Sequence, residues 1–264
     1  MLTDDQQKQI NDLCQTFKGQ IPLDCIAEGI RSCILNAQDL LEDGMLLFNA
    51  ERYPRAMSIF ISTMEEIGKI STLCSMARVP KENQALWKEF WKNFRSHQYK
   101  STAAFTHTYA DEARQHPEVI LSAAVLQEDL SELTERFRQA GLYVDFYVSE
   151  NRWILPAEIT SAEATKWKQR AETSLSRVQA AYNLGLYSEP ALLIQREVFG
   201  PLNATRPRQK ELGAHIVAQF QQDARALQKQ YWKRLVERGV LPIDSDVQVM
   251  GVQLRDLIGA DEQC

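Results

Sequence analysis

The sequence contains few of the residues that build loop-rich or cross-linked proteins. Only 11 of its 264 residues are glycine and 9 are proline, which leaves little room for a β architecture with many turns. Its five cysteines are an odd number and form no Cys-x-x-Cys pair, so neither a disulfide framework nor a zinc site is indicated. We therefore expect an all-α protein with free thiols.

Long apolar runs are also missing. No stretch of about 18 consecutive apolar residues occurs. The N-terminal residues, Met1 to Gln7, lack the basic region and apolar run of a secretory signal. A phosphate-cradling glycine loop and clustered metal-ligand spacing are absent as well. We expect a cytoplasmic protein with no membrane partner, no cofactor and no metal.

Apolar residues recur at helical spacing in the first half of the chain. The pattern runs from Ile30 to Phe48 and resumes from Ala56 to Cys74. Residues 49–53 make a short connection, and Pro54 suits a first helical turn, so we expect two antiparallel helices. Pro80 and Pro117 are expected to begin two further helices, which would complete a helical bundle over residues 1–150.

The second half is expected to form a C-terminal helical extension over residues 151–264. An alternating run at 141–146 predicts a strand or an extended segment before it. Thr160 and Glu163 have the spacing of a capping box at the start of a helix. Pro190 begins a shorter helix, and a long amphipathic pattern follows from residue 208 to 238. With no repeat or linker at the boundary, the two halves could share one core.

Charge is distributed unevenly along the chain. The formal net charge of −5 argues against general attraction to nucleic acid. Between residues 78 and 100, however, six cations face only two carboxylates. This segment could receive a polyanion, or it could be a solvated helix face on which cations happen to cluster.

A paired carboxylate and one histidine are the candidate site residues. Glu65 and Glu66 are about 100° apart on a helix, with Lys69 one turn on, so they either form surface ion pairs or place one carboxylate toward a polar cleft. His97 follows the cations Lys92 and Arg95. A base of near-neutral pKa and nearby cations are what metal-independent RNA cleavage requires.

Other residues around this segment are weaker candidates for the functional site. Asn93 lies one helical turn before His97, so both could reach the same end of the bundle. Trp87 and Trp91 could stack on bases, but their spacing is more typical of core residues, and we assign them to the core. A further arginine and histidine at comparable spacing, Arg208 and His215, are explained by chance.

Five short motifs, taken together, resemble a known family. In chain order they are Asn36-Ala37-x-x-Leu40-Leu41, Arg52-Tyr53-Pro54-Arg55-Ala56, Glu65-Glu66-Ile67-Gly68-Lys69, Phe94-Arg95-Ser96-His97-x-x-Lys100 and Gly141-Leu142-Tyr143-Val144-Asp145. This pattern, over roughly residues 27–156, resembles the AbiV-type abortive infection proteins of bacteria, which belong to the HEPN superfamily.

The resemblance implies a HEPN-like helical bundle with additional C-terminal helices, commonly dimeric, that acts in defence against phage. Many HEPN proteins are metal-independent endoribonucleases whose site holds an arginine, a polar residue and, four to six residues after the arginine, a histidine. Here Lys92 stands where arginine is expected, followed by Asn93 and His97. A lysine keeps the positive charge of an arginine, but it cannot form two parallel hydrogen bonds to a phosphate.

We therefore expect a toxin-like effector that cleaves RNA of the translation apparatus as a homodimer, with a phage protein as a possible activator. The expected catalytic residues are His97, Lys92, Asn93, Arg95, Glu65 and Glu66, and the expected RNA-binding residues are Lys69, Lys88 and Lys100. The alternative is a non-catalytic HEPN interaction module that binds a phage or host protein to arrest growth. In that case the same cluster would be a packed polar network.

Overall fold

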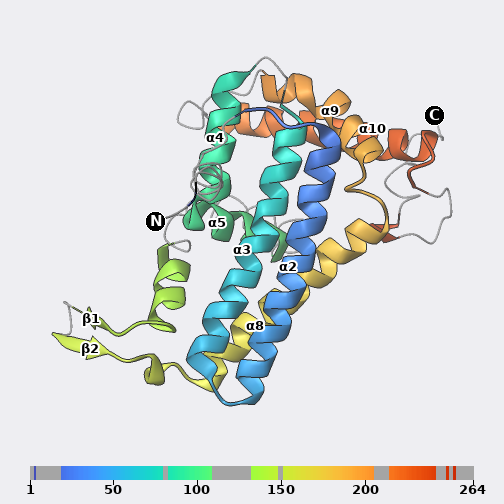
Figure 1. Cartoon of the computed structure of the whole chain (residues 1–264). Helices are drawn as coiled ribbons and strands as arrows, with labels where there is room; N and C mark the ends of the chain where they lie inside the picture. The colour runs from blue at the N-terminus through green and yellow to red at the C-terminus, as the bar shows by residue number, and fades with distance from the viewer. Residues whose placement is uncertain are drawn as a thin grey trace.

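The computed structural model describes residues 3, 19–79, 83–108, 132–147, 151–204, 214–241, 248–249 and 252–253. Most of these residues are helical, as Figure 1 shows. The strands in the described part form only two small antiparallel hairpins. The expected all-α architecture is therefore confirmed. The helix expected to begin at Pro80 begins instead at Gln84, with Asn83 at its N-cap. The start expected at Pro117 lies outside the described residues.

Two long antiparallel helices form the centre of the bundle. Helix α2 spans Leu23–Asn49, and α3 spans Tyr53–Ala77 with Pro54 in its first turn. A three-residue turn joins them, in which Glu51 adopts a left-handed conformation (φ 58°). The expected helical hairpin is thus confirmed, although α2 starts earlier than the predicted Ile30. Pro22 stands at its N-cap, where the missing N–H costs nothing.

Helix α8, Ser161–Asn183, packs across this hairpin (Figure 1). Its apolar face buries Ala164, Trp167 and Ala171 in one cluster with residues of α3. The predicted capping box begins it, since the Thr160 hydroxyl accepts from the Glu163 N–H at 3.3 Å and the Glu163 carboxylate accepts from the Thr160 N–H at 2.7 Å. Residues beyond 150 therefore contribute to the core of the first half, while the boundary at 150 stays a prediction.

Helices α4, Gln84–Arg95, and α5, His97–Thr108, meet at a sharp break at Ser96. Trp87 is fully buried, and the partly buried Trp91 donates its indole N–H to the Gly19 carbonyl at 2.7 Å. Both tryptophans thus pack against the bundle as expected. The break matters because it makes His97 the first residue of α5, which packs against α3.

A hairpin interrupts the helices between α5 and α8. Residues 132–140 are helical, and then β1, Asp145–Tyr147, pairs with β2, Arg152–Ile154. The short 3-10 helix η1, Pro156–Glu158, follows. The alternating run at 141–146 overlaps the strand only at Asp145 and Phe146, since residues 141–144 precede it. In Figure 1 the hairpin projects from the side of the bundle.

The C-terminal helices form a second apolar cluster. Helices α9, Glu189–Ala204, and α10, Ala214–Glu237, bury Ile194, Trp232 and Leu235 between them. Gly239 ends this segment with φ 67°. The remaining strands, β3 (Gln248–Val249) and β4 (Val252–Gln253), form the second hairpin. None of the described helices combines the length and apolarity that a membrane crossing requires.

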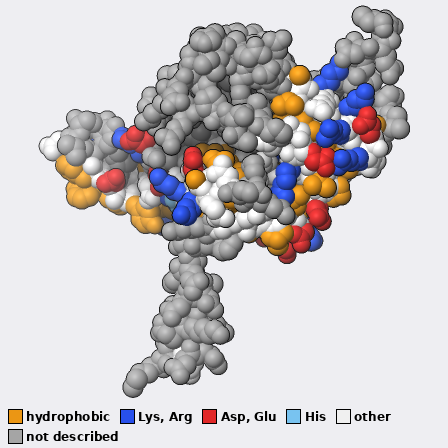
Figure 2. Space-filling view, turned by 90° about the horizontal axis from the view of Figure 1, so that it is seen from above, with side chains coloured by type: hydrophobic (Ala, Val, Ile, Leu, Met, Phe, Trp, Pro, Cys, Tyr) orange, Lys and Arg blue, Asp and Glu red, His pale blue; other side chains and the backbone are white. Residues whose placement is uncertain are grey.

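Figure 2 views the molecule from the end where α4, α9 and α10 lie. Basic and acidic side chains are intermixed over the described part of this face. For example, Arg234 of α10 and Arg238, the residue after that helix, both pair with Glu197 of α9, at 3.3 and 2.6 Å. One carboxylate is thus shared by two arginines.

Gly68 provides a test of the α3–α5 packing. A Cβ built at Gly68 would lie 2.0 Å from the Lys100 carbonyl oxygen, a backbone atom that cannot rotate away. We expect Gly68→Ala to lower the free energy of unfolding by about 1–3 kcal/mol in urea denaturation. Gly29→Ala is the control, because its Cβ would meet only the Leu73 side chain at 3.5 Å. It should change stability by less than about 1 kcal/mol, in the stabilising direction. Equal effects of both substitutions would contradict the close approach.

Candidate functional site

Three segments far apart in the sequence bring a cluster of charged side chains together. Glu65 comes from the middle of α3, His97 and Lys100 from the first turn of α5, and Arg138 from the helical residues 132–140. The Ser58 hydroxyl donates to the Arg138 carbonyl at 2.8 Å and holds that last helix against α3. We call Glu65, His97, Lys100, Ser101, Glu135 and Arg138 the Glu65 cluster.

The central contact joins His97 to Glu65. The His97 Nδ1 lies 2.6 Å from the Glu65 Oε2. A carboxylate accepts hydrogen bonds but donates none, so the Nδ1 carries the proton and the Nε2 is the basic nitrogen. The Glu65 side chain is buried, whereas 50% of the His97 side chain is exposed. The protein therefore fixes the tautomer and orientation of the imidazole from within, while the ring reaches the surface.

Buried cations compensate the Glu65 carboxylate. The Lys100 Nζ lies 3.7 Å from one carboxylate oxygen, and the Arg138 Nε lies 3.7 Å from the other. The Ser101 hydroxyl lies 3.5 Å from the same oxygen as Arg138. A carboxylate in the protein interior needs such partners, because an uncompensated buried charge is strongly destabilising.

A second carboxylate, Glu135, holds Arg138 in place. Arg138 donates two hydrogen bonds to Glu135, at 2.7 and 3.0 Å, and Gln139 donates a third at 2.7 Å. Burial raises the pKa of Glu135, but the hydrogen bonds from Arg138 and Gln139 outweigh it, and the pKa lies below its ordinary value. The same pairing raises the pKa of Arg138. Both groups are charged at neutral pH.

The donor atoms of Glu65, His97 and Glu135 all lie within 4.8 Å of one another, close enough to share a metal ion. Two cations of the protein already contact these carboxylates, however, since Lys100 and Arg138 lie against Glu65 and Arg138 also pairs with Glu135. A metal ion would have to compete with both. The two carboxylates and two cations balance one another in charge, and His97 is the member of the cluster with the most exposed side chain among these ion pairs.

The structure distinguishes the two candidate glutamates. Glu65 contacts His97, while Glu66 pairs with Lys69, whose ammonium also lies 5.5 Å from the centre of the Phe94 ring. Glu66 therefore has the ion pair considered for this carboxylate pair, and Glu65 contacts His97 from inside the protein. Lys69 is therefore engaged with Glu66.

The other expected site residues lie at the end of α4 or inside the protein. Lys92 and Arg95 are both exposed on the last turn of α4, and Arg95 lies over the Trp91 ring at 5.4 Å. Asn93 is half-buried, and Lys88 is exposed. Lys100, expected to bind RNA, is instead buried beside Glu65. Its position indicates a counter-ion for Glu65 and not a surface contact.

Sequence reasoning did not find Arg138, Glu135 and Ser101. Glu135 and Arg138 are three apart, a common spacing for a surface ion pair, and no residue pattern indicates that their helix packs beside Glu65. The available signal was the Gly141 that follows. A Cβ there would lie 2.2 Å from the Ser58 hydroxyl oxygen, so this glycine marks the close approach of the segment to α3.

The comparisons with known proteins give one match. A family model for AbiV, of the HEPN class, matches residues 25–176, which is more than half of the chain. The matched region contains the Glu65 cluster and extends into α8. Neither the curated proteins nor the solved structures include a significant match.

The first prediction for the cluster compares the adjacent glutamates. Glu65→Ala leaves Lys100 and Arg138 without their shared carboxylate, and we expect it to lower the free energy of unfolding by about 3 kcal/mol. Glu66→Ala removes one ion pair nearer the surface and should cost about 1 kcal/mol or less. Urea denaturation of both variants measures the difference. A larger loss for Glu66→Ala would show that the buried network is misassigned.

The second prediction concerns acid stability. Because the pKa of Glu135 is lower in the folded protein than its ordinary value of 4.5, its ionised form stabilises the fold above that pH. This contribution is lost as the pH falls below about 4.5. We expect Glu135→Gln to be less stable at neutral pH and to lose less stability on acidification than wild type. Glu132→Gln is the control, since exposed Glu132 pairs with Arg136 in solvent and contributes little. Parallel pH curves for wild type and Glu135→Gln would contradict the prediction.

Proposed function

This chain belongs to the AbiV family of HEPN proteins, a membership that implies an anti-phage role in abortive infection, and we propose that it performs this role as a metal-independent endoribonuclease. The substrate is RNA of the translation apparatus, whose cleavage stops growth of the infected cell. The protein works as a homodimer, and a phage protein is the proposed activator.

One observation carries the proposal, the contact between His97 and Glu65. The buried carboxylate contacts Nδ1 at 2.6 Å, which leaves Nε2 as the basic nitrogen of a half-exposed ring. A neutral imidazole in this tautomer can accept the proton of a ribose 2′-hydroxyl. The oxygen formed can then attack the adjacent phosphate, which yields a 2′,3′-cyclic phosphate and a free 5′-hydroxyl end.

The cations divide into two groups with separate roles. Lys100 and Arg138 are buried and hold Glu65, so they position His97 indirectly. Lys92 and Arg95 are exposed on the turn that precedes His97 by one residue, and we assign them to the scissile phosphate, with Asn93 as its positioning residue. Fixed cations beside a phosphate stabilise the charge that develops in the transition state.

A non-catalytic interaction module is the second candidate function. It is favoured by the satisfied charges of the Glu65 cluster and by Lys92, since a lysine cannot bind phosphate in the bidentate manner of arginine. In that case the cluster stabilises the bundle, and the protein arrests growth by binding a phage or host protein. This second function does not explain why the His97 ring is half-exposed.

The test compares wild type with His97→Ala on total cellular RNA in the presence of a chelator. We expect wild type to produce specific cuts that end in 2′,3′-cyclic phosphates, and His97→Ala to be at least about 100-fold slower, because it lacks the base. His215→Ala is the control, since this histidine also follows an arginine at comparable spacing. The assay is repeated with phage lysate as a source of activator. Unchanged cleavage by His97→Ala would remove the site, and no cleavage under any condition would favour the interaction module.

A further inference from the structure

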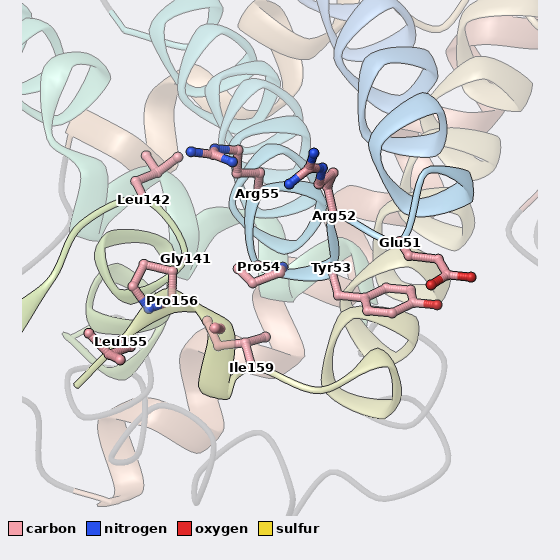
Figure 3. A pocket seen from close by; sticks show the side chains of 11 residues that line it. Glu51, Arg52, Tyr53, Pro54, Arg55, Gly141, Leu142, Leu155, Pro156 and Ile159 are labelled. Carbon is pink, nitrogen blue, oxygen red and sulfur yellow. The ribbon is translucent and has the colours of Figure 1, made fainter.

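A pocket of about 460 Å³ lies apart from His97, between the α2–α3 turn and the chain that flanks the β1–β2 hairpin (Figure 3). Residues 51–55 form one wall, and Leu142, Leu155, Pro156 and Ile159 contribute to the other. The volume is within the range of small-molecule sites in proteins. The pocket therefore has room for a ligand of about the size of one nucleotide.

The pocket carries positive charge on its α3 wall. Arg52 and Arg55 are exposed, and neither forms an ion pair with any other described residue. In Figure 3 the two guanidinium groups lie along the same edge of the pocket, and the Glu51 carboxylate points away from them, beside the Tyr53 ring. The N-terminus of α3 also has no side-chain cap and no acidic residue in its first turn. This wall thus offers two exposed cations beside a positive helix end.

The hairpin next to the pocket exposes an apolar face. Phe146 and Trp153 are cross-strand partners, with their ring centres 5.3 Å apart. Because side chains alternate along a strand, Val144 and Leu155 share their face. All four are exposed, Trp153 to 62%, and Leu155 also lines the pocket. The aromatic face is therefore continuous with the pocket and its two arginines.

We propose that this pocket and the adjoining hairpin face bind unpaired nucleotides of an RNA strand, with Arg52 and Arg55 on phosphates and Phe146 and Trp153 against bases. The site rests on the proposed function, since it holds the RNA that His97 cleaves. Exposed aromatic rings beside cations are how proteins bind single-stranded nucleic acid. A protein partner would explain the apolar face but not two exposed arginines that form no ion pair with a described residue.

The position of the pocket suits a strand that continues to His97. Arg55 and Glu65 are ten residues apart on α3, which places them about 15 Å apart along the helix axis. The segment from Arg138 to Leu142 connects the two places directly, with Arg138 in the Glu65 cluster and Leu142 in the pocket. Nucleotides held in the pocket would thus set the register of the strand across the catalytic histidine.

The test measures binding of a short unstructured oligouridine in the His97→Ala background, where cleavage cannot interfere. We expect Trp153→Leu to weaken binding at least about fivefold, because a leucine keeps the apolar contact but cannot stack. Trp153→Phe should retain affinity. Arg52→Gln/Arg55→Gln should reduce the slope of log affinity against log salt concentration by up to about 1.4, the change for two phosphate contacts on a single strand.

Arg31→Gln/Lys233→Gln is the matched control, since it removes two exposed charges from α2 and α10. It should leave the salt slope near that of the parent protein. Equal effects of the two double variants, or no oligouridine binding by the parent, would overturn the site. The site would also be overturned if Trp153→Leu changed the oligomeric state without weakening oligouridine binding. That result would assign the apolar face of the hairpin to contact with a second copy of the chain. Wild-type cleavage of cellular RNA is measured separately, so pocket binding without cleavage would contradict the nuclease and not the pocket.

Discussion

The arrangement of the whole site depends on one buried carboxylate. Glu65 is 4% exposed, in the middle of a helix whose other inward residues are mostly apolar. An ionised carboxylate is stable there only with charged and hydrogen-bonding partners close by. His97, Lys100 and Ser101 of α5 and Arg138 of the following helix supply them. The requirement to compensate one charge therefore joins three segments that lie up to 73 residues apart along the chain.

The same carboxylate links stability to chemistry. A histidine on a solvated helix end would sample several ring orientations and both tautomers. The Glu65 oxygen removes this freedom, because its contact with Nδ1 selects one tautomer and one ring orientation. Lys100 and Arg138 keep that oxygen in place, and Glu135 in turn holds Arg138. In the proposed nuclease, residues that never touch the RNA would thus determine how well His97 is placed to accept a proton.

The helical architecture could be predicted from the sequence, because it rests on local signals. Apolar periodicity located α2 and α3, and Pro54 and the Thr160–Glu163 box located helix starts. The alternating run at 141–146 indicated only the first residues of β1. The site was predicted only where its residues belong to a recognisable motif, as His97 and Glu65 do. Arg138 was missed, and Lys100 was assigned to the surface, because burial of a cation depends on which helices pack together and leaves no local pattern.

Gly68 determines how closely α5 approaches α3. The Lys100 carbonyl rests where a side chain would otherwise stand on α3, so the two backbones touch one helical turn from the contact between Glu65 and His97. A side chain at this position would push α5 outward, and His97 with it. The missing side chain is therefore one of the conditions under which the imidazole can reach a carboxylate inside the bundle.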